Sequence, residues 1–220
     1  KCISPSPLRK PSPRKPSPRK PSPRKPSPRK PSHKKYMNIM VRKHDNFLSH
    51  LYDAHPNLIT SLRKYTGTSY NKYKKVNQAL RSGKKLPDSI KKIVDNIDAI
   101  FDMVEPTTRE ITVYRGVKRD EDVISNGAFI STSYSKTVAA SFTNDDCCFM
   151  IIKIPVGSKI LFVESISNYP EEKEILLSRK GNLILEKFVP PNNVKDKDEY
   201  ETIEERINRI AQYFVRYEPN

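Results

Sequence analysis

The spacing of apolar residues changes at Pro106, and this change limits the folds open to the chain more than any other feature. Before Pro106, apolar side chains recur every three or four residues, as they do along amphipathic helices. After it, they alternate with polar residues or form short continuous runs, as they do in strands. The order predicts an α+β protein in which a helical half precedes a sheet.

The helical half is expected to hold four helices. Their expected spans are about residues 36–51, a second helix after Pro56 with Asn57 as its N-cap, about residues 73–83, and a fourth that begins after Pro87 and runs to about Phe101. Three tyrosines near the third helix are either core residues or stacking partners for a nucleotide base: Tyr65, Tyr70 and Tyr73.

The sheet half is expected to hold six strands, near residues 111–116, 128–132, 147–154, 159–163, 174–177 and 182–189. Asn126-Gly127 is a turn signal before the second of them, and Ser135 begins a short helix over residues 136–142. The alternation of a strand predicts that the thiols of Cys147 and Cys148 point to opposite faces. Apolar residues at helical spacing predict a C-terminal helix over residues 203–214, which could become extended near Phe214.

Residues 9–32 repeat a five-residue unit, Lys-Pro-Ser-Pro-Arg, which contains no side chain able to form a core. Residues 1–35 carry thirteen Lys or Arg and no acid, whereas the remaining 185 residues carry 28 basic and 25 acidic side chains. We therefore divide the chain into a disordered basic tail, residues 1–35, and a folded domain, residues 36–220. The tail fits three roles: a solvated spacer, an electrostatic anchor for nucleic acid, or a segment for nuclear import or phosphorylation.

Several classes of protein find no support in the sequence. No apolar run of about eighteen residues occurs, so no membrane span is expected, and a signal peptide is either absent or already removed. All four His residues precede Pro56, so we expect neither a zinc site nor a His-based triad, and no metal. Neither a Rossmann glycine motif nor a P-loop occurs. Three cysteines without a disulfide framework favour a reducing, intracellular compartment, with secretion left open.

Three short polar motifs lie at the ends of expected strands: Tyr114-Arg115-Gly116, Ser131-Thr132-Ser133 and Glu172-Lys173-Glu174. Side chains two residues apart in a strand share a face, so Glu172 and Glu174 should point the same way, roughly 7 Å apart. A lone pair of this kind is most often the charged face of an edge strand. The basic and hydroxyl motifs upstream favour an acid/base site instead.

In this order, the three motifs resemble the Arg, Ser-Thr-Ser and Glu-x-Glu motifs of the arginine-directed mono-ADP-ribosyltransferases, the family that includes the actin-modifying binary toxins. The resemblance covers about residues 65–189. It includes Tyr65-x-Gly67 followed by Val76-Asn77 and Leu80-Arg81, which is similar to a segment of C3-like and binary-toxin transferases. It implies that family's fold, with N-terminal helices packed on a mixed β-sandwich core, and NAD as co-substrate.

The resemblance also implies which residues bind NAD. Arg115 would grip a phosphate or ribose oxygen with its planar fork of donors. The other residues implied for the NAD site are Gly116, Ser131, Thr132, Ser133 and Phe142.

For catalysis, the resemblance implies three residues. Glu174 would bind the 2'-hydroxyl of the nicotinamide ribose and stabilise an oxocarbenium-like transition state, and Ser131 would hold Glu174 in place. Glu172 would face the acceptor and pair with its guanidinium. Tyr169, in the turn before these acids, is expected to contact the acceptor protein.

The implied activity is transfer of ADP-ribose from NAD to an arginine of a target protein, with release of nicotinamide. Actin is one candidate target, and the host cytoplasm or nucleus would be the place of action. A Gln in place of Glu172 would have indicated an asparagine acceptor. The alternative is a catalytically silent or NAD-hydrolysing fold that serves as a basic-tailed module for binding nucleic acid or protein; NAD turnover with and without an acceptor separates the two.

Overall fold

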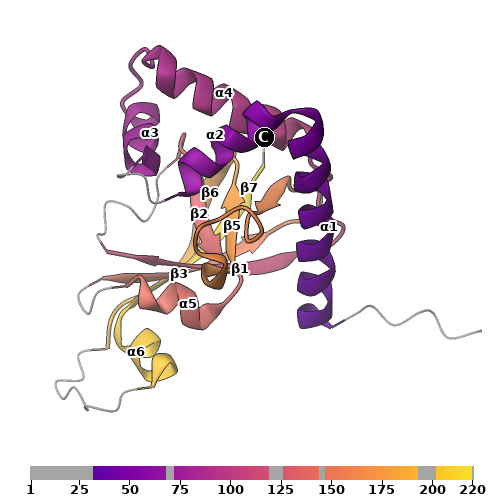
Figure 1. Ribbon diagram of the computed structural model, residues 1–220. Coiled ribbons are helices and arrows are strands. Elements are labelled where there is room, and N and C mark those ends of the chain that lie inside the picture. The colour runs from indigo at the N-terminus through magenta and orange to yellow at the C-terminus, as the bar shows by residue number, and fades with distance from the viewer. Residues whose placement is uncertain (1–31, 68–71, 119–125, 144–146, 193–201, 220) are drawn as a thin grey trace, which may run out of the picture. The chain divides into compact units, whose positions relative to one another are not determined.

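The computed structural model describes residues 32–67, 72–118, 126–143, 147–192 and 202–219 (Figure 1). The expected α+β class is confirmed: within these ranges, four α-helices come first, and a sheet with two further α-helices follows. The predicted tail, apart from its last four residues, lies outside the described residues, as does Tyr70. The division at residue 35 therefore stays a prediction.

The four leading helices are α1 (His33–Ala54), α2 (Pro56–Thr66), α3 (Lys72–Arg81) and α4 (Asp88–Met103). The prediction of Asn57 as an N-cap is wrong, because α2 begins at Pro56 and His55 occupies the cap position without a side-chain bond. Proline suits the first helical position because the N–H that it lacks has no partner there. No helix within the described residues is long and apolar enough to cross a membrane.

In the described part of the chain, seven strands are joined by hydrogen bonds into one mixed sheet, in the order β4-β5-β2-β1-β3-β7-β6. All neighbouring pairs are antiparallel except β3 and β7, which are parallel. The strands are β1 (Ile111–Val117), β2 (Ile130–Ser133), β3 (Cys148–Ile154), β4 (Ile160–Phe162), β5 (Glu174–Leu177), β6 (Asn182–Val189) and β7 (Ala211–Glu218).

The C-terminal helix is shorter than predicted. Helix α6 (Ile203–Arg209) ends before Ile210, and the chain becomes extended at Ala211 rather than near Phe214. Strand β7 then lies between β3 and β6, where each edge offers hydrogen-bond partners to its backbone. Helical spacing of Ile210 and Phe214 therefore does not decide their structure, because pairing within the sheet overrides it.

The helices cover both faces of the sheet. Successive strand residues belong to different apolar clusters: Met150 packs with α1, whereas Phe149 packs with α5 (Lys136–Ser141) and α6. In the same way Phe162 packs on the α1 side, and Leu161 packs with α2 and α4. Because neighbouring side chains of a strand point to opposite faces, α2–α4 and α5–α6 share the face opposite the one that the first half of α1 covers. The second half of α1 packs with α2 and α4 through Leu48 and Leu51.

The two buried cysteines lie together, contrary to the prediction that they point to opposite faces. Their Sγ atoms are 2.6 Å apart. Strand β3 begins at Cys148, so Cys147 precedes the strand and the alternation of side chains does not extend to it.

Candidate functional site

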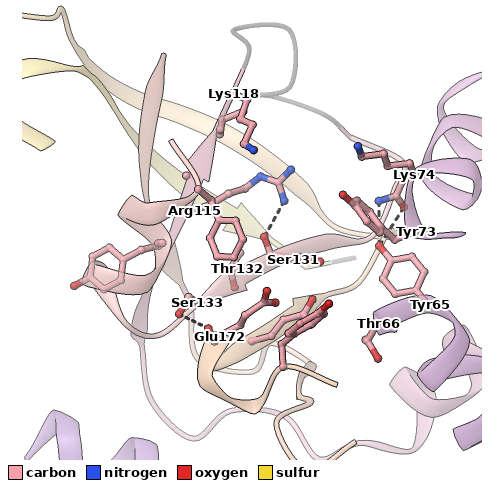
Figure 2. Close-up of a pocket in the computed structure, with 18 of the residues that line it drawn as sticks. Tyr65, Thr66, Tyr73, Lys74, Arg115, Lys118, Ser131, Thr132, Ser133 and Glu172 are labelled. Carbon is pink, nitrogen blue, oxygen red and sulfur yellow. Dashed lines mark hydrogen bonds between the residues drawn. The ribbon is translucent and has the colours of Figure 1, made fainter. Parts of the chain in front are cut away.

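A cleft with a volume of about 850 Å³ lies on the sheet face that α2–α4 and α5 share (Figure 2). Its size falls within the range of cofactor and ligand sites. All nine residues that the family resemblance implies for binding or catalysis line it: Arg115, Gly116, Ser131, Thr132, Ser133, Phe142, Tyr169, Glu172 and Glu174.

Arg115 reaches the cleft from β1. Within the described residues, β1 and β2 have one register pair, Tyr114 with Ser133, and Arg115 follows Tyr114 in β1. Its Nη1 donates to the main-chain oxygen of Ser131 at 2.8 Å, which fixes the guanidinium beside the second motif.

Gly116 is required by close packing rather than by its own chemistry. A Cβ at this position would lie 2.2 Å from the main-chain oxygen of Ala139 and 2.9 Å from the nitrogen of Thr143. Only glycine lets α5 approach β1 so closely. This approach brings Phe142, the residue after α5, to the edge of the cleft.

The hydroxyls of β2 have three separate tasks. Ser131 and Ser133 point to the same face of the sheet. The Ser131 side chain hydrogen-bonds the carboxylate of Glu174, which lies opposite Ser133 in β5. Thr132 donates to the main-chain oxygen of Ile175 at 2.8 Å and so ties β2 to β5. Ser133 donates to the main-chain oxygen of Glu172 at 2.8 Å.

Glu174 is a buried carboxylate at the start of β5, with 8% of its surface exposed. Its pKa is raised from 4.5 to about 7, chiefly because the carboxylate is buried and in smaller part because Glu172 lies nearby. The Ser131 hydrogen bond and the charge of Arg115 oppose this shift of the pKa. A carboxylate held near half-ionisation at neutral pH in a cleft is typical of a catalytic group.

Glu172 does not share a strand with Glu174, so the predicted geometry of the pair is wrong. Glu172 closes a 3-10 turn, Pro170–Glu172, and Lys173 follows in the left-handed conformation with φ of 50°. This turn replaces the expected pleat, yet both acids line the same cleft. Glu172 is half-buried, and burial together with the charge of Glu171 raises its pKa.

Helix α3 forms another wall of the cleft with residues that the sequence left unassigned. Lys74, Gln78 and Arg81 lie about one turn apart along α3 and line the cleft. Lys118, just after β1, lines it as well. An exposed lysine on a polar helix or just after a strand carries no local signal of a site, so only the assembled structure reveals Lys74 and Lys118.

The tyrosines near α3 differ in role. Tyr65 is 1% exposed and its hydroxyl bonds Asn77, which in turn donates to the main-chain oxygen of Phe129 at 3.1 Å. Tyr65 is therefore a core residue that also borders the cleft. Tyr73 lines the cleft with 43% of its surface exposed, so its ring is not part of the core.

The cleft combines four cations, Lys74, Arg81, Arg115 and Lys118, with the two acids Glu172 and Glu174. Such a lining suits a ligand that carries phosphates at one end and a cationic group at the other. Among the residues that the structure describes, no group of three His, Cys, Asp or Glu side chains could hold a metal ion.

Comparison with known proteins agrees with this geometry. A family model described as ADP-ribosyltransferase exoenzyme matches residues 56–121 and 119–209. Secreted exoenzyme S of Pseudomonas aeruginosa is 28% identical over 133 residues, which are 57% of this chain and 28% of that protein's length. The chain thus spans little more than a quarter of this curated relative.

Two solved structures show the same fold. Plx2a, an ADP-ribosyltransferase toxin from Paenibacillus larvae, superposes with a TM-score of 0.62 over 84% of this chain and 96% of that one, at 17% identity. C3stau2 from S. aureus, solved with NAD, superposes with a TM-score of 0.61 over 83% of this chain and 96% of that one, at 15% identity.

Proposed function

Because this chain belongs to the ADP-ribosyltransferase exoenzyme family, we propose that it cleaves NAD and transfers ADP-ribose to an arginine side chain of a target protein, with release of nicotinamide. One observation carries the proposal. The guanidinium of Arg115, the buried carboxylate of Glu174 and the half-buried carboxylate of Glu172 meet in a single cleft of suitable size.

The cations of the cleft hold the dinucleotide. NAD carries two phosphates, and Arg115 offers them a planar fork of donors whose direction is set by the bond to Ser131. Lys74, Arg81 and Lys118 add positive charge around the same space. The nicotinamide ring is cationic, so the acidic side of the cleft attracts that end of the molecule.

Glu174 acts on the bond that breaks. The glycosidic bond between the ribose anomeric carbon and the nicotinamide nitrogen cleaves, and neutral nicotinamide leaves with the bonding electrons. Positive charge then develops on the ribose, where an ionised Glu174 stabilises it. The cationic ring of bound NAD lowers the pKa of Glu174 from its value of about 7 and favours the ionised form.

Glu172 acts on the acceptor. A guanidinium pairs well with a carboxylate, and a guanidinium nitrogen can attack the anomeric carbon only if a base takes its proton. The raised pKa of Glu172 makes it a better proton acceptor than an ordinary surface carboxylate. Ser133 holds the backbone of Glu172 through a 2.8 Å hydrogen bond, so this base is positioned by the same strand that positions Glu174.

The test uses small acceptors, which avoids the need to know the target protein. The protein is incubated with NAD and either agmatine, which carries a guanidinium, or propionamide, which carries an amide, and the products are identified by mass spectrometry. We expect nicotinamide together with ADP-ribosyl-agmatine. Product with the amide alone would contradict the arginine acceptor, and free ADP-ribose with every acceptor would show a hydrolase. Purified actin is the first protein acceptor to try, since the Glu-x-Glu motif resembles that of actin-modifying toxins.

A further inference from the structure

One segment of the folded domain contains basic side chains and no acidic ones. Residues 54–87 contain no Asp or Glu, whereas the rest of residues 36–220 holds 25 acids and 20 basic side chains. The segment carries eight Lys or Arg, namely Arg63, Lys64, Lys72, Lys74, Lys75, Arg81, Lys84 and Lys85. The positive charge of the folded domain is therefore concentrated in α2, α3 and the turn that follows.

Five of these cations are exposed on α3 and the turn after it, and we call them the basic face: Lys74, Lys75, Arg81, Lys84 and Lys85. Lys74 and Arg81 line the cleft, and the other three lie outside it. Within the described part of the chain, no ion pair joins Lys75, Lys84 or Lys85 to an acid. Lys75, Lys84 and Lys85 thus extend the basic face from the cleft onto the neighbouring surface, with charges that a partner can neutralise.

Negative charge lies on a different side of the cleft, in the 3-10 turn Pro170–Glu172. The 3-10 turn carries Glu171, which is exposed, and Glu172, which is half-buried and lines the cleft beside Tyr169. Figure 2 shows Lys74 and Glu172 reaching the cleft from different sides. The rim of the cleft is therefore positively charged along α3 and negatively charged along the 3-10 turn.

We propose that the basic face docks an acidic patch of the acceptor protein, next to the arginine that enters the acidic side of the cleft. This inference rests on the proposed function and adds the class of acceptor to it. A surface with both signs of charge matches a protein that carries both signs in the reverse arrangement. A nucleic acid or an anionic membrane is negative throughout, so Glu171 and Glu172 would repel it.

The expected gain in rate is modest and depends on salt. Exposed ion pairs are individually weak and are screened by salt over about 10 Å at roughly 0.1 M. Three such pairs together should raise kcat/KM for an acidic acceptor about tenfold at low salt, which corresponds to about 1.4 kcal/mol. At high salt the gain should largely disappear.

The test compares two synthetic peptides that each contain one arginine. In the first, a block of Asp lies several residues from the arginine; in the second, Asn replaces every Asp. The variant Lys75→Glu, Lys84→Glu, Lys85→Glu reverses the basic face without changing a cleft residue. A matched control, Lys34→Glu, Lys35→Glu, Lys187→Glu, reverses three exposed lysines outside residues 54–87. NAD hydrolysis and transfer to agmatine are measured in every protein.

The proposal predicts that the parent and the control prefer the Asp peptide about tenfold at low salt, and that the basic-face variant loses this preference. Transfer to agmatine should be equal in all three proteins. Equal rates on the two peptides, or a variant that keeps the preference, would overturn the docking surface while agmatine transfer leaves the proposed function standing. No agmatine transfer by the parent would instead overturn the proposed function itself.

A competition assay separates the other polyanions. Short single-stranded RNA and phosphatidylserine vesicles are added to the agmatine and Asn-peptide reactions. We expect little inhibition of either reaction. Strong inhibition that the basic-face variant abolishes, without any preference for the Asp peptide, would show a surface for nucleic acid or membrane and would overturn the protein-docking proposal.

Discussion

Replacing the buried carboxylate of Glu174 by an amide should stabilise the fold, and the gain should depend on pH. The folded-state pKa of Glu174 is raised from 4.5 to about 7. The folded state therefore binds this proton more tightly than the unfolded state does. The free energy of unfolding should be unaffected by this group below pH 4.5, fall as pH rises from 4.5 to 7, and remain lower above pH 7.

A shift of this size corresponds to about 3 kcal/mol at about 1.4 kcal/mol per pKa unit. Glutamine does not titrate, and its amide oxygen can still accept a hydrogen bond from Ser131. Glu174→Gln should therefore leave the stability near pH 4.5 almost unchanged and raise the free energy of unfolding by up to about 3 kcal/mol at pH 8.

The assay is urea unfolding of the parent and of Glu174→Gln, without NAD, at pH 4.5 and pH 8. Glu171→Gln serves as the control, because Glu171 is exposed in the neighbouring turn and should change stability little at either pH. A gain that is the same at both pH values would show that packing, not the cost of ionising a buried carboxylate, separates the variants. The claim of a poised Glu174 would then be refuted.

Three further predictions concern the other parts of the site and the tail. Arg115→Lys keeps the charge but loses the planar fork, so KM for NAD should rise roughly tenfold while thermal unfolding stays unchanged; an unaltered KM would remove Arg115 from the phosphate site. Ser131→Ala removes a hydrogen bond that lowers the pKa of Glu174, so kcat should fall more than KM changes, and the rise of kcat/KM with pH should move to higher pH; an unmoved pH profile would count against this role. Deleting residues 1–31 should leave NAD turnover on agmatine nearly unchanged, because the tail repeat has no core-forming side chain and the described residues that line the cleft all fall within residues 65–174. If the tail binds nucleic acid, fluorescence anisotropy should show DNA binding that weakens steeply with salt for the full chain and not for the shortened one.

The position of the site could be predicted from the sequence because its residues follow strand ends. The Arg115, Ser131 and Glu174 motifs lie on β1, β2 and β5, and these strands are direct neighbours in the sheet. Short polar motifs at the ends of neighbouring strands come together as soon as the sheet forms. All the residues proposed from these motifs therefore line one cleft, and their roles are open to the variants described above.

Other features depend on contacts that no local pattern shows. The strand alternation assumed for Glu172 fails because Lys173 adopts a positive φ, which a lysine seldom does and which the sequence does not signal. Lys74 and Lys118 come from α3 and from the end of β1, far apart along the chain, and each resembles an ordinary solvated lysine. Strand β7 enters the sheet in parallel with β3, a long-range pairing that the helical spacing around Ile210 conceals.

The two carboxylates have separate roles in the proposed reaction: Glu174 acts in the cleavage of NAD, and Glu172 acts in the transfer to the acceptor. Glu174→Gln should abolish both ADP-ribosyl transfer to agmatine and hydrolysis of NAD, because both reactions break the same glycosidic bond. Glu172→Gln keeps the shape of the side chain but removes the base that faces the guanidinium. Losing a charged contact at the reacting centre costs on the order of 2 to 4 kcal/mol, so transfer should fall roughly 30-fold to 1,000-fold.

The most direct measurement follows both products in one reaction. The parent, Glu172→Gln and Glu174→Gln are each incubated with NAD and agmatine, and ADP-ribosyl-agmatine and free ADP-ribose are quantified together. We expect Glu172→Gln to lose transfer while hydrolysis of NAD by water persists, and Glu174→Gln to lose both. Transfer by Glu172→Gln at the parent's rate would contradict the assignment of the two carboxylates.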